Sequence, residues 1–128
     1  VEIATRGGYK RCGLYRKVVG KHATGRDVME AARAGDELGL AALDSFATWL
    51  GRGLAVVADV LDPALIVLGG GVAADASMFI DTARETMAAT MVGAGYRPVA
   101  QIQCAELGPQ AGMIGVADLA RTMVHEQQ

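Results

Sequence analysis

The stretch Asp62-Pro-Ala-Leu-Ile-Val-Leu-Gly-Gly-Gly-Val72 decides the fold class of this 128-residue chain. Pro63 disfavours the helical state in the residue before it, so a helix that precedes this stretch has to end at Asp62. Residues 64–68 are an unbroken apolar run, which is typical of a strand covered by helices on both faces. We therefore expect an interior, largely buried strand at 64–68, with Gly69–Gly71 at its carboxyl end beside a helix N-terminus.

Two helices are expected before this strand. Thr24 and Asp27 resemble a capping box in front of a short helix at 26–34. Asp36 is placed to cap a second helix that continues to Asp62. Apolar residues recur along that second helix at helical spacing, and we expect them to form its buried stripe: Leu43, Phe46, Leu50, Leu54, Val57 and Leu61.

The chain after the glycines continues the alternation of helix and strand. We expect a helix from Met78 to about Val92, begun by Asp75 or Ser77, with one face formed by Phe79, Ala83, Met87 and Met91. Residues 99–107 alternate in polarity, which predicts a strand with one more exposed face and with Cys104 as a small core residue. A last helix is expected at 111–124. The order helix, helix, strand, helix, strand, helix is that of an α/β protein.

The composition is that of a soluble globular domain. Hydrophobic residues make up 52% of the chain, charged residues 20%, and the net charge is -2, so no nucleic-acid partner is expected. No apolar run reaches about 18 residues, so we expect no membrane-spanning helix. Two cysteines pair at most once, which favours a reduced, cytoplasmic protein. Residues 1–22 are basic and lack clear periodicity, and we expect a loop with one short strand there.

The glycine triplet is the main candidate for a binding site. In an open α/β sheet, ligands bind beyond the carboxyl ends of the strands. Glycines at that place let the backbone approach a nucleotide, and free N–H groups can meet phosphate. The triplet is neither a Walker loop nor G-x-G-x-x-G, and a plain tight turn is the alternative reading.

Candidates for catalysis and metal binding are weaker. Cys12, His22, Cys104 and His125 lack the spacing of metal ligands, so no metal site is assigned. Asp59, Asp62 and Asp75 flank the strand and the turn, where an Asp is more often a cap than a base. No residue set of the Ser-His-Asp or Cys-His kind is present, so no catalytic residue is assigned.

The segment 62–72 resembles the adenosine motif of the ROK family of sugar kinases. Other segments match the family in order and spacing, most closely the actinobacterial glucokinases, over roughly residues 24–124: Glu30-Ala-Ala-Arg-Ala-Gly-Asp36, Gly95-Tyr-Arg-Pro98 and Leu107-Gly-Pro-Gln-Ala-Gly-Met-Ile-Gly-Val-Ala117. The resemblance implies a partial actin-like ATPase (ribonuclease H-like) lobe, from the C-terminal half of such a kinase, with residues 24–128 as its ATP-binding part.

The resemblance also implies a site and a reaction. It assigns Gly69, Gly70 and Gly71 to backbone contact with ATP and places Ala111 and Gly112 near the nucleotide. In the family, ATP with Mg²⁺ transfers a phosphoryl group to the 6-hydroxyl of glucose, largely through positioning and electrostatics. ATP and Mg²⁺ are thus the expected cofactors, and nucleotide and glucose the expected ligands.

The first residues depart from the family pattern. The catalytic Asp of the family lies in an N-terminal lobe that we do not find here, and no Glu-x-Gly-His sugar motif is present. Gly7-Gly8-Tyr-Lys-Arg-Cys12-Gly13 begins like the family's zinc cluster, but no further Cys follows before Thr24. We expect 1–23 to be a degenerate remnant of the zinc and sugar-loop region, from a frame slip or a deletion, without zinc and poorly ordered at 1–22.

The chain alone is therefore expected to be inactive as a glucokinase. Two other readings stay open: a portion of a sugar-responsive ROK transcriptional regulator, or a non-enzymatic remnant that self-associates. Two strands are too few to cover the apolar stripe of the long helix, and large exposed apolar patches mark association surfaces. A homo-oligomer is the expected state.

Overall fold

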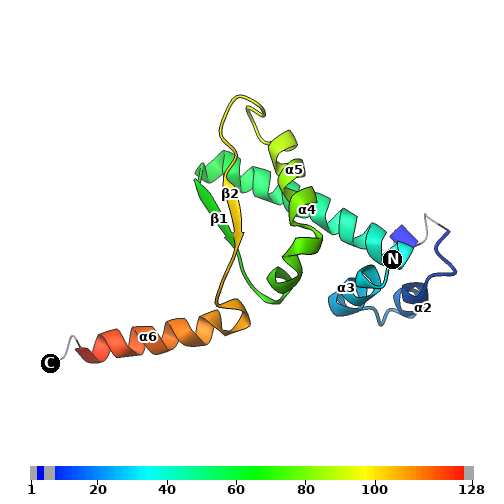
Figure 1. The fold of residues 1–128 in the computed structure, drawn as a ribbon, viewed down its shortest axis with the longest axis horizontal. Coiled ribbons are helices and arrows are strands. Elements are labelled where there is room, and N and C mark those ends of the chain that lie inside the picture. Colours follow the sequence, from blue (N-terminus) through cyan, green and yellow to red (C-terminus); the bar gives the residue numbers. More distant parts are fainter. Residues whose placement is uncertain (1–2, 5–7, 126–128) are drawn as a thin grey trace.

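A single long helix, α4 (Glu37–Leu61), runs through the molecule, and most other elements are arranged along it (Figure 1). The computed structural model describes residues 3–4 and 8–125. α2 and α3 lie at the end where α4 begins, the two strands and α5 lie toward the end where it finishes, and α6 projects away. The remaining elements, of which η1 and η2 are 3₁₀ helices, are α2 (Gly13–Val19), α3 (Gly25–Arg33), β1 (Leu65–Leu68), η1 (Gly71–Met78), α5 (Ile80–Thr90), β2 (Gln101–Cys104), η2 (Gly108–Gln110) and α6 (Ala111–His125).

Side chains cap the first two predicted helices as expected. The Thr24 hydroxyl accepts a hydrogen bond from the Asp27 amide at 3.3 Å, and the Asp27 carboxylate accepts one from the Thr24 amide at 2.8 Å, which completes the capping box. Asp36 accepts hydrogen bonds from the amides of Leu38 and Gly39, both at 3.0 Å. Asp62 ends α4 in the left-handed conformation, with φ 43°. These boundaries confirm the predicted helices within a residue or two.

The buried face of α4 is formed largely by small residues. A Cβ added at Gly51 would lie 2.5 Å from the carbonyl oxygen of Ala83, and one added at Gly39 would lie 2.6 Å from the amide nitrogen of Ala32. The backbone of α4 therefore nearly touches α5 at one point and α3 at another. The buried residues along this face are Leu38, Gly39, Leu43, Ala47, Gly51, Leu54, Ala55 and Ala58.

The predicted apolar stripe of α4 is thus only partly correct. Leu43 and Leu54 are buried, but Phe46, Val57 and Leu61 are exposed. Neighbouring helices approach most closely where side chains are small, so the contact face of α4 is centred on Gly and Ala positions. A prediction based on large apolar residues does not include these positions. The predicted face of α5 is confirmed, because Phe79, Ala83, Met87 and Met91 are all buried.

β1 and β2 form a parallel pair, in register from Leu65 with Gln101 to Leu68 with Cys104. α4 and α5 cover one face of the pair, where Ile66 and Ile102 join a core cluster with Leu54 and Met87. On the other face Leu65 and Val67 are 44% and 57% exposed. The alternating burial of β1 shows that only one face is covered.

The prediction of an interior, largely buried strand at 64–68 is therefore wrong. Within the described residues the sheet contains these two strands alone, so one edge of β1 is unpaired. The unbroken apolar run does predict a strand, but burial on both faces needs elements on both sides. Cys104 is also exposed rather than in the core: it is the last residue of β2, and its alternation with Ile102 predicts a side of the strand but not a neighbour that covers it.

Residues 13–19 form helix α2 where the sequence predicted a loop with one short strand. Leu14 is the buried residue of α2 and packs in a cluster with Leu38. Such a short helix with one strongly buried side chain leaves no periodicity to detect. The Lys17 ammonium pairs with the Asp27 carboxylate. Hydrogen bonds from Lys17, and then from Thr24, hold the pKa of Asp27 below its usual value. The part of the prediction that falls on 1–2 and 5–7 lies outside the described residues.

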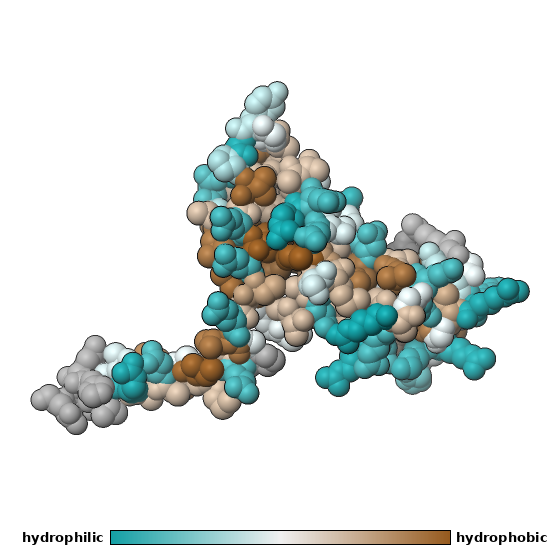
Figure 2. Space-filling model, viewed as in Figure 1, coloured by the Kyte–Doolittle hydropathy of each residue, from teal (hydrophilic) through white to brown (hydrophobic). Residues whose placement is uncertain are grey.

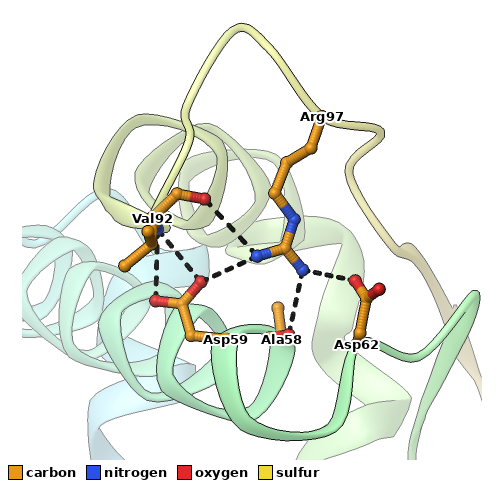
Figure 3. A network of polar contacts seen from close by, with 5 residues as sticks. All are labelled: Ala58, Asp59, Asp62, Val92 and Arg97. Carbon is orange, nitrogen blue, oxygen red and sulfur yellow. Dashed lines mark hydrogen bonds and ion pairs between the residues drawn. The ribbon is translucent and has the colours of Figure 1, made fainter.

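The turn between α5 and β2 is held to the end of α4 by Arg97 (Figure 3). Arg97 donates from Nη1 to Asp59 at 3.1 Å and from Nη2 to the Ala58 carbonyl at 3.0 Å, and it also pairs with Asp62. The Val92 amide donates to the same Asp59 carboxylate at 3.0 Å. Asp59 and Asp62 thus anchor this turn and fix where β2 begins beside β1.

α4 is also long and apolar enough to cross a membrane, with a mean hydropathy of 1.2 over an 18-residue window. The expectation of no membrane-spanning helix rested on the lack of an unbroken apolar run of about 18 residues. Length and composition alone are weak evidence, since the core helix of a globular domain meets the same criterion. Here α4 packs against both α3 and α5 along its small-residue face.

We predict that Gly51→Ala lowers the free energy of unfolding by about 1–3 kcal/mol, because the added methyl group overpacks the contact with α5. Gly53→Ala on the same helix is the matched control. No atom lies within 4 Å of a Cβ at that position, so it should leave stability unchanged or raise it by up to about 1 kcal/mol. Urea denaturation of both variants measures the difference. Equal stability of the two variants would contradict the close approach of α4 and α5.

Candidate functional site

The glycine triplet forms a sharp turn at the carboxyl end of β1. Gly70 has φ 87° and ψ -178°, a backbone conformation that is essentially restricted to glycine. Gly69 and Gly71 do not have positive φ, and a Cβ at Gly71 would meet open space. The chain enters the 3₁₀ helix η1 directly at Gly71. Gly70 therefore makes the turn, while Gly69 and Gly71 leave its surface free of side chains.

A groove of about 700 Å³ opens beside this turn. One wall comes from α3 and the first half of α4, and the other comes from the start of η1. Apolar side chains dominate the lining. The lining residues are Gly25, Arg26, Val28, Met29, Glu30, Arg33, Ala42, Leu43, Phe46, Gly71, Val72, Ala74 and Asp75.

Phe46 gives the groove an aromatic surface. Its ring is 41% exposed and packs edge-on against the buried ring of Phe79, with centroids 5.1 Å apart and planes at 83°. Aromatic rings prefer this arrangement, so Phe79 holds Phe46 in place. The exposure of Phe46, which departs from the predicted stripe, is exposure to this groove.

The charged side chains of the groove balance one another. Arg26 and Arg33 are opposed by Glu30 and Asp75, and the Arg33 guanidinium forms an ion pair with the Asp75 carboxylate from the opposite wall. Asp75 does not begin the next helix as predicted, because α5 starts at Ile80 without a side-chain cap. An Asp that caps a helix and an Asp that forms a distant ion pair cannot be told apart from the sequence alone. The structure shows that Asp75 is the second kind.

The residues expected to contact ATP are only partly brought together. Gly71 lines the groove, and Gly69 and Gly70 lie just before it in the turn. Ala111 and Gly112 begin α6, directly after η2, and η2 contacts η1. Among the described residues that line the groove, neither of these two is found. Arg33 was not predicted as a site residue, although it lies in the segment 30–36 that carries the family resemblance, while Phe46 was predicted as a buried stripe residue and Asp75 as a helix cap.

Within residues 3–4 and 8–125, no group of three or more His, Cys, Asp or Glu side chains is placed to hold a metal ion. Cys12 is half-buried and Cys104 is exposed at the end of β2. The absence of zinc stays a prediction that elemental analysis of the pure protein would test.

Comparison with known proteins places this geometry in context. The model of the ROK family matches residues 8–123. The glucokinase of Streptomyces coelicolor is 37% identical over 97 residues, which are 76% of this chain and 31% of that protein. The bifunctional enzyme NanE/NanK of Brucella melitensis is 42% identical over 97 residues, or 18% of its length. The chain thus spans less than a third of these relatives.

The fold of this chain is also similar to that of a solved ROK family structure. The ROK family glucokinase from Streptomyces griseus, in complex with glucose and AMPPNP, superposes with a TM-score of 0.76 at 32% identity. The match covers 94% of this chain and 39% of that one. The expected fold class, a partial actin-like ATPase lobe of α/β type, is confirmed by this likeness.

We predict that Gly70→Ala destabilises the protein by about 1–3 kcal/mol, because alanine in this backbone conformation is strained. Gly71→Ala serves as the control, since its Cβ would meet no atom within 4 Å, and it should shift stability by no more than about 0.5 kcal/mol. Thermal and urea denaturation of both variants provide the measurement. A Gly70→Ala protein as stable as the control would mean that the turn has another conformation.

Proposed function

The chain belongs to the ROK family, and from that membership we propose that it is the nucleotide-binding part of an ATP-dependent sugar kinase, with glucose as the sugar. One observation carries the proposal: the groove runs directly into the glycine turn through Gly71. A flat base needs an apolar slot, and a triphosphate needs a nearby backbone free of side chains. Both are adjacent here.

The groove suits the base and the turn suits the phosphates. The groove has an aromatic surface at Phe46 and balanced charges, so it favours an uncharged ring over an anion. The turn exposes backbone at Gly69 and Gly71, where a phosphate can approach closely. The Streptomyces griseus glucokinase binds AMPPNP, an ATP analogue, which supports ATP as the nucleotide of this chain.

Ala111 and Gly112 are proposed to flank the nucleotide from the far side of the turn. η2 contacts η1, which brings the start of α6 toward the glycine turn. Mg²⁺ is proposed to enter with the triphosphate, because it is held mainly through substrate phosphates with one or two carboxylates. We assign residues 24–128 to the ATP-binding lobe and 1–23 to a remnant of the sugar-loop region, and we place the protein in the cytoplasm.

The phosphoryl transfer itself is proposed to lie beyond this chain. The resemblance supplies no catalytic base or sugar-binding residue at any position here. Glu30 and Asp75 are the carboxylates among the described groove residues, and Asp75 is paired with Arg33. We propose that neither acts as the general base, so that the chain alone lacks the proton acceptor that phosphoryl transfer to a sugar hydroxyl needs.

Self-association is a second function that a specific observation favours. Figure 2 shows apolar side chains at the surface around the sheet and at α6. They include Leu65 and Val67 on the uncovered face of β1 and, on α6, Met113, Val116 and Leu119. Apolar surface of this kind, together with the unpaired edge of β1, favours contact with a second copy.

We predict that the chain binds ATP with Mg²⁺ in a calorimetric titration and that Gly71→Gln weakens this binding by about tenfold, because the new side chain fills the mouth of the groove where a Cβ now has open space. In a coupled assay with ATP, Mg²⁺ and glucose, the wild-type chain should show no turnover. Rates of about 1–10³ per second are ordinary for enzymes. The proposal fails if ATP does not bind, and turnover in that range would show that the active site is misplaced.

We also predict that the chain forms oligomers, as measured by light scattering after size-exclusion chromatography. Replacing Leu65 and Val67 together by Lys should shift the protein to monomer, because charged side chains on a strand face oppose association. Val19→Lys, on an exposed residue at the other end of the molecule, is the control and should leave the oligomer intact. A wild-type chain that stays monomeric at high concentration contradicts the idea.

A further inference from the structure

The ion pair between Arg33 and Asp75 joins the two walls of the groove. Arg33 lies in the last turn of α3 and Asp75 lies in η1, 42 residues further along the chain. Both side chains also line the groove. Among the ion pairs within the described residues, this is the one that connects the opposite sides of the candidate site.

Both members of the pair stand on fixed backbone. Ala32 and Ala76, the neighbours of Arg33 and Asp75, are each 4% exposed and belong to one core cluster with Leu43 and Phe79. The close approach at Gly39 fixes α3 against α4. The packed core therefore sets how far apart the groove walls stand, and the pair fixes the two side chains that face each other across the groove.

The pair is too exposed to be explained by stability. The side chains of Arg33 and Asp75 are 52% and 23% exposed, and ion pairs in such positions contribute little to folding. Pairing does, however, neutralise two of the four charges that line the groove. The ring of a base entering the groove then meets two side chains in a fixed arrangement and no unpaired charge from either member.

We propose that Arg33 and Asp75 form a positioning pair, which holds their two side chains across the groove in the arrangement that admits a nucleoside base and so supports the base rather than the phosphates of the bound nucleotide. This inference rests on the proposed function. Without the pair, the two side chains are in this arrangement for only part of the time. The apparent dissociation constant of the base then rises in inverse proportion to that fraction.

The test uses the full chain and two probes that separate base from phosphate: adenosine, and inorganic tripolyphosphate with Mg²⁺. The variant is the double substitution Arg33→Gln with Asp75→Asn, which removes the pair but keeps the net charge. The matched control is Arg84→Gln with Asp81→Asn, which removes an exposed pair within α5, away from the groove. A charge-reversed variant, Arg33→Asp with Asp75→Arg, tests for recovery of the pair.

In calorimetric titrations we expect the neutral double variant to bind adenosine about tenfold more weakly, as for a groove that is competent about one tenth of the time. Tripolyphosphate binding and the melting temperature should stay as in the control variant. Charge reversal should recover part of the lost adenosine affinity. A purely structural pair would instead lower the melting temperature and weaken both probes together.

Each other result overturns the inference in a distinguishable way. Equal adenosine binding by wild type and neutral variant excludes a positioning role but leaves the nucleotide site in place. Parallel loss of both probes, or a large drop in melting temperature, makes the pair structural. If the wild type binds neither probe, the proposed nucleotide function fails as well. If charge reversal recovers nothing, the two residues do not act as a pair.

Discussion

The close packing of α4 against its neighbours is the constraint on which the rest of the structure depends. A backbone approach such as that of Gly51 to the carbonyl oxygen of Ala83 is possible only without a side chain. This contact sets the position of α5, and α5 with α4 then forms the surface on which β1 and β2 lie. At the other end, Gly39 does the same for α3. One helix thus positions both the sheet and one wall of the groove.

The candidate site follows from this arrangement. β1 ends where α4 and α5 have placed it, and the chain must then turn sharply to enter η1. Gly70 makes that turn in a conformation that other residues avoid. The turn places the start of η1 beside the first half of α4, to which α3 is fixed. The start of η1 and α3 therefore face each other across the groove. The apolar slot and the glycine turn are adjacent because both are built on the same helix.

The same architecture leaves apolar surface uncovered. The helices cover one face of the two-stranded sheet, and α6 projects away from the other elements (Figure 1). Leu65, Val67 and the apolar side chains of α6 are exposed as a result. The part of this chain that matches the Streptomyces coelicolor glucokinase covers 31% of that protein. The exposed apolar surface of this lobe is therefore available for contact with another protein surface.

Local chemistry allowed the sequence to determine the elements themselves. Thr24, Asp36 and Asp62 mark helix ends through hydrogen bonds to nearby backbone, and the run at 64–68 followed by glycines marks a strand and a turn, because these signals act within a few residues. Burial depended on partners distant in the sequence, so only the tertiary structure decided that β1 has one exposed face and that α4 packs through Gly and Ala. The pairing of Arg33 with Asp75 and the exposure of Phe46 to the groove were decided in the same way, since they join α3, α4 and η1. No pattern in the sequence reports a contact between residues so far apart.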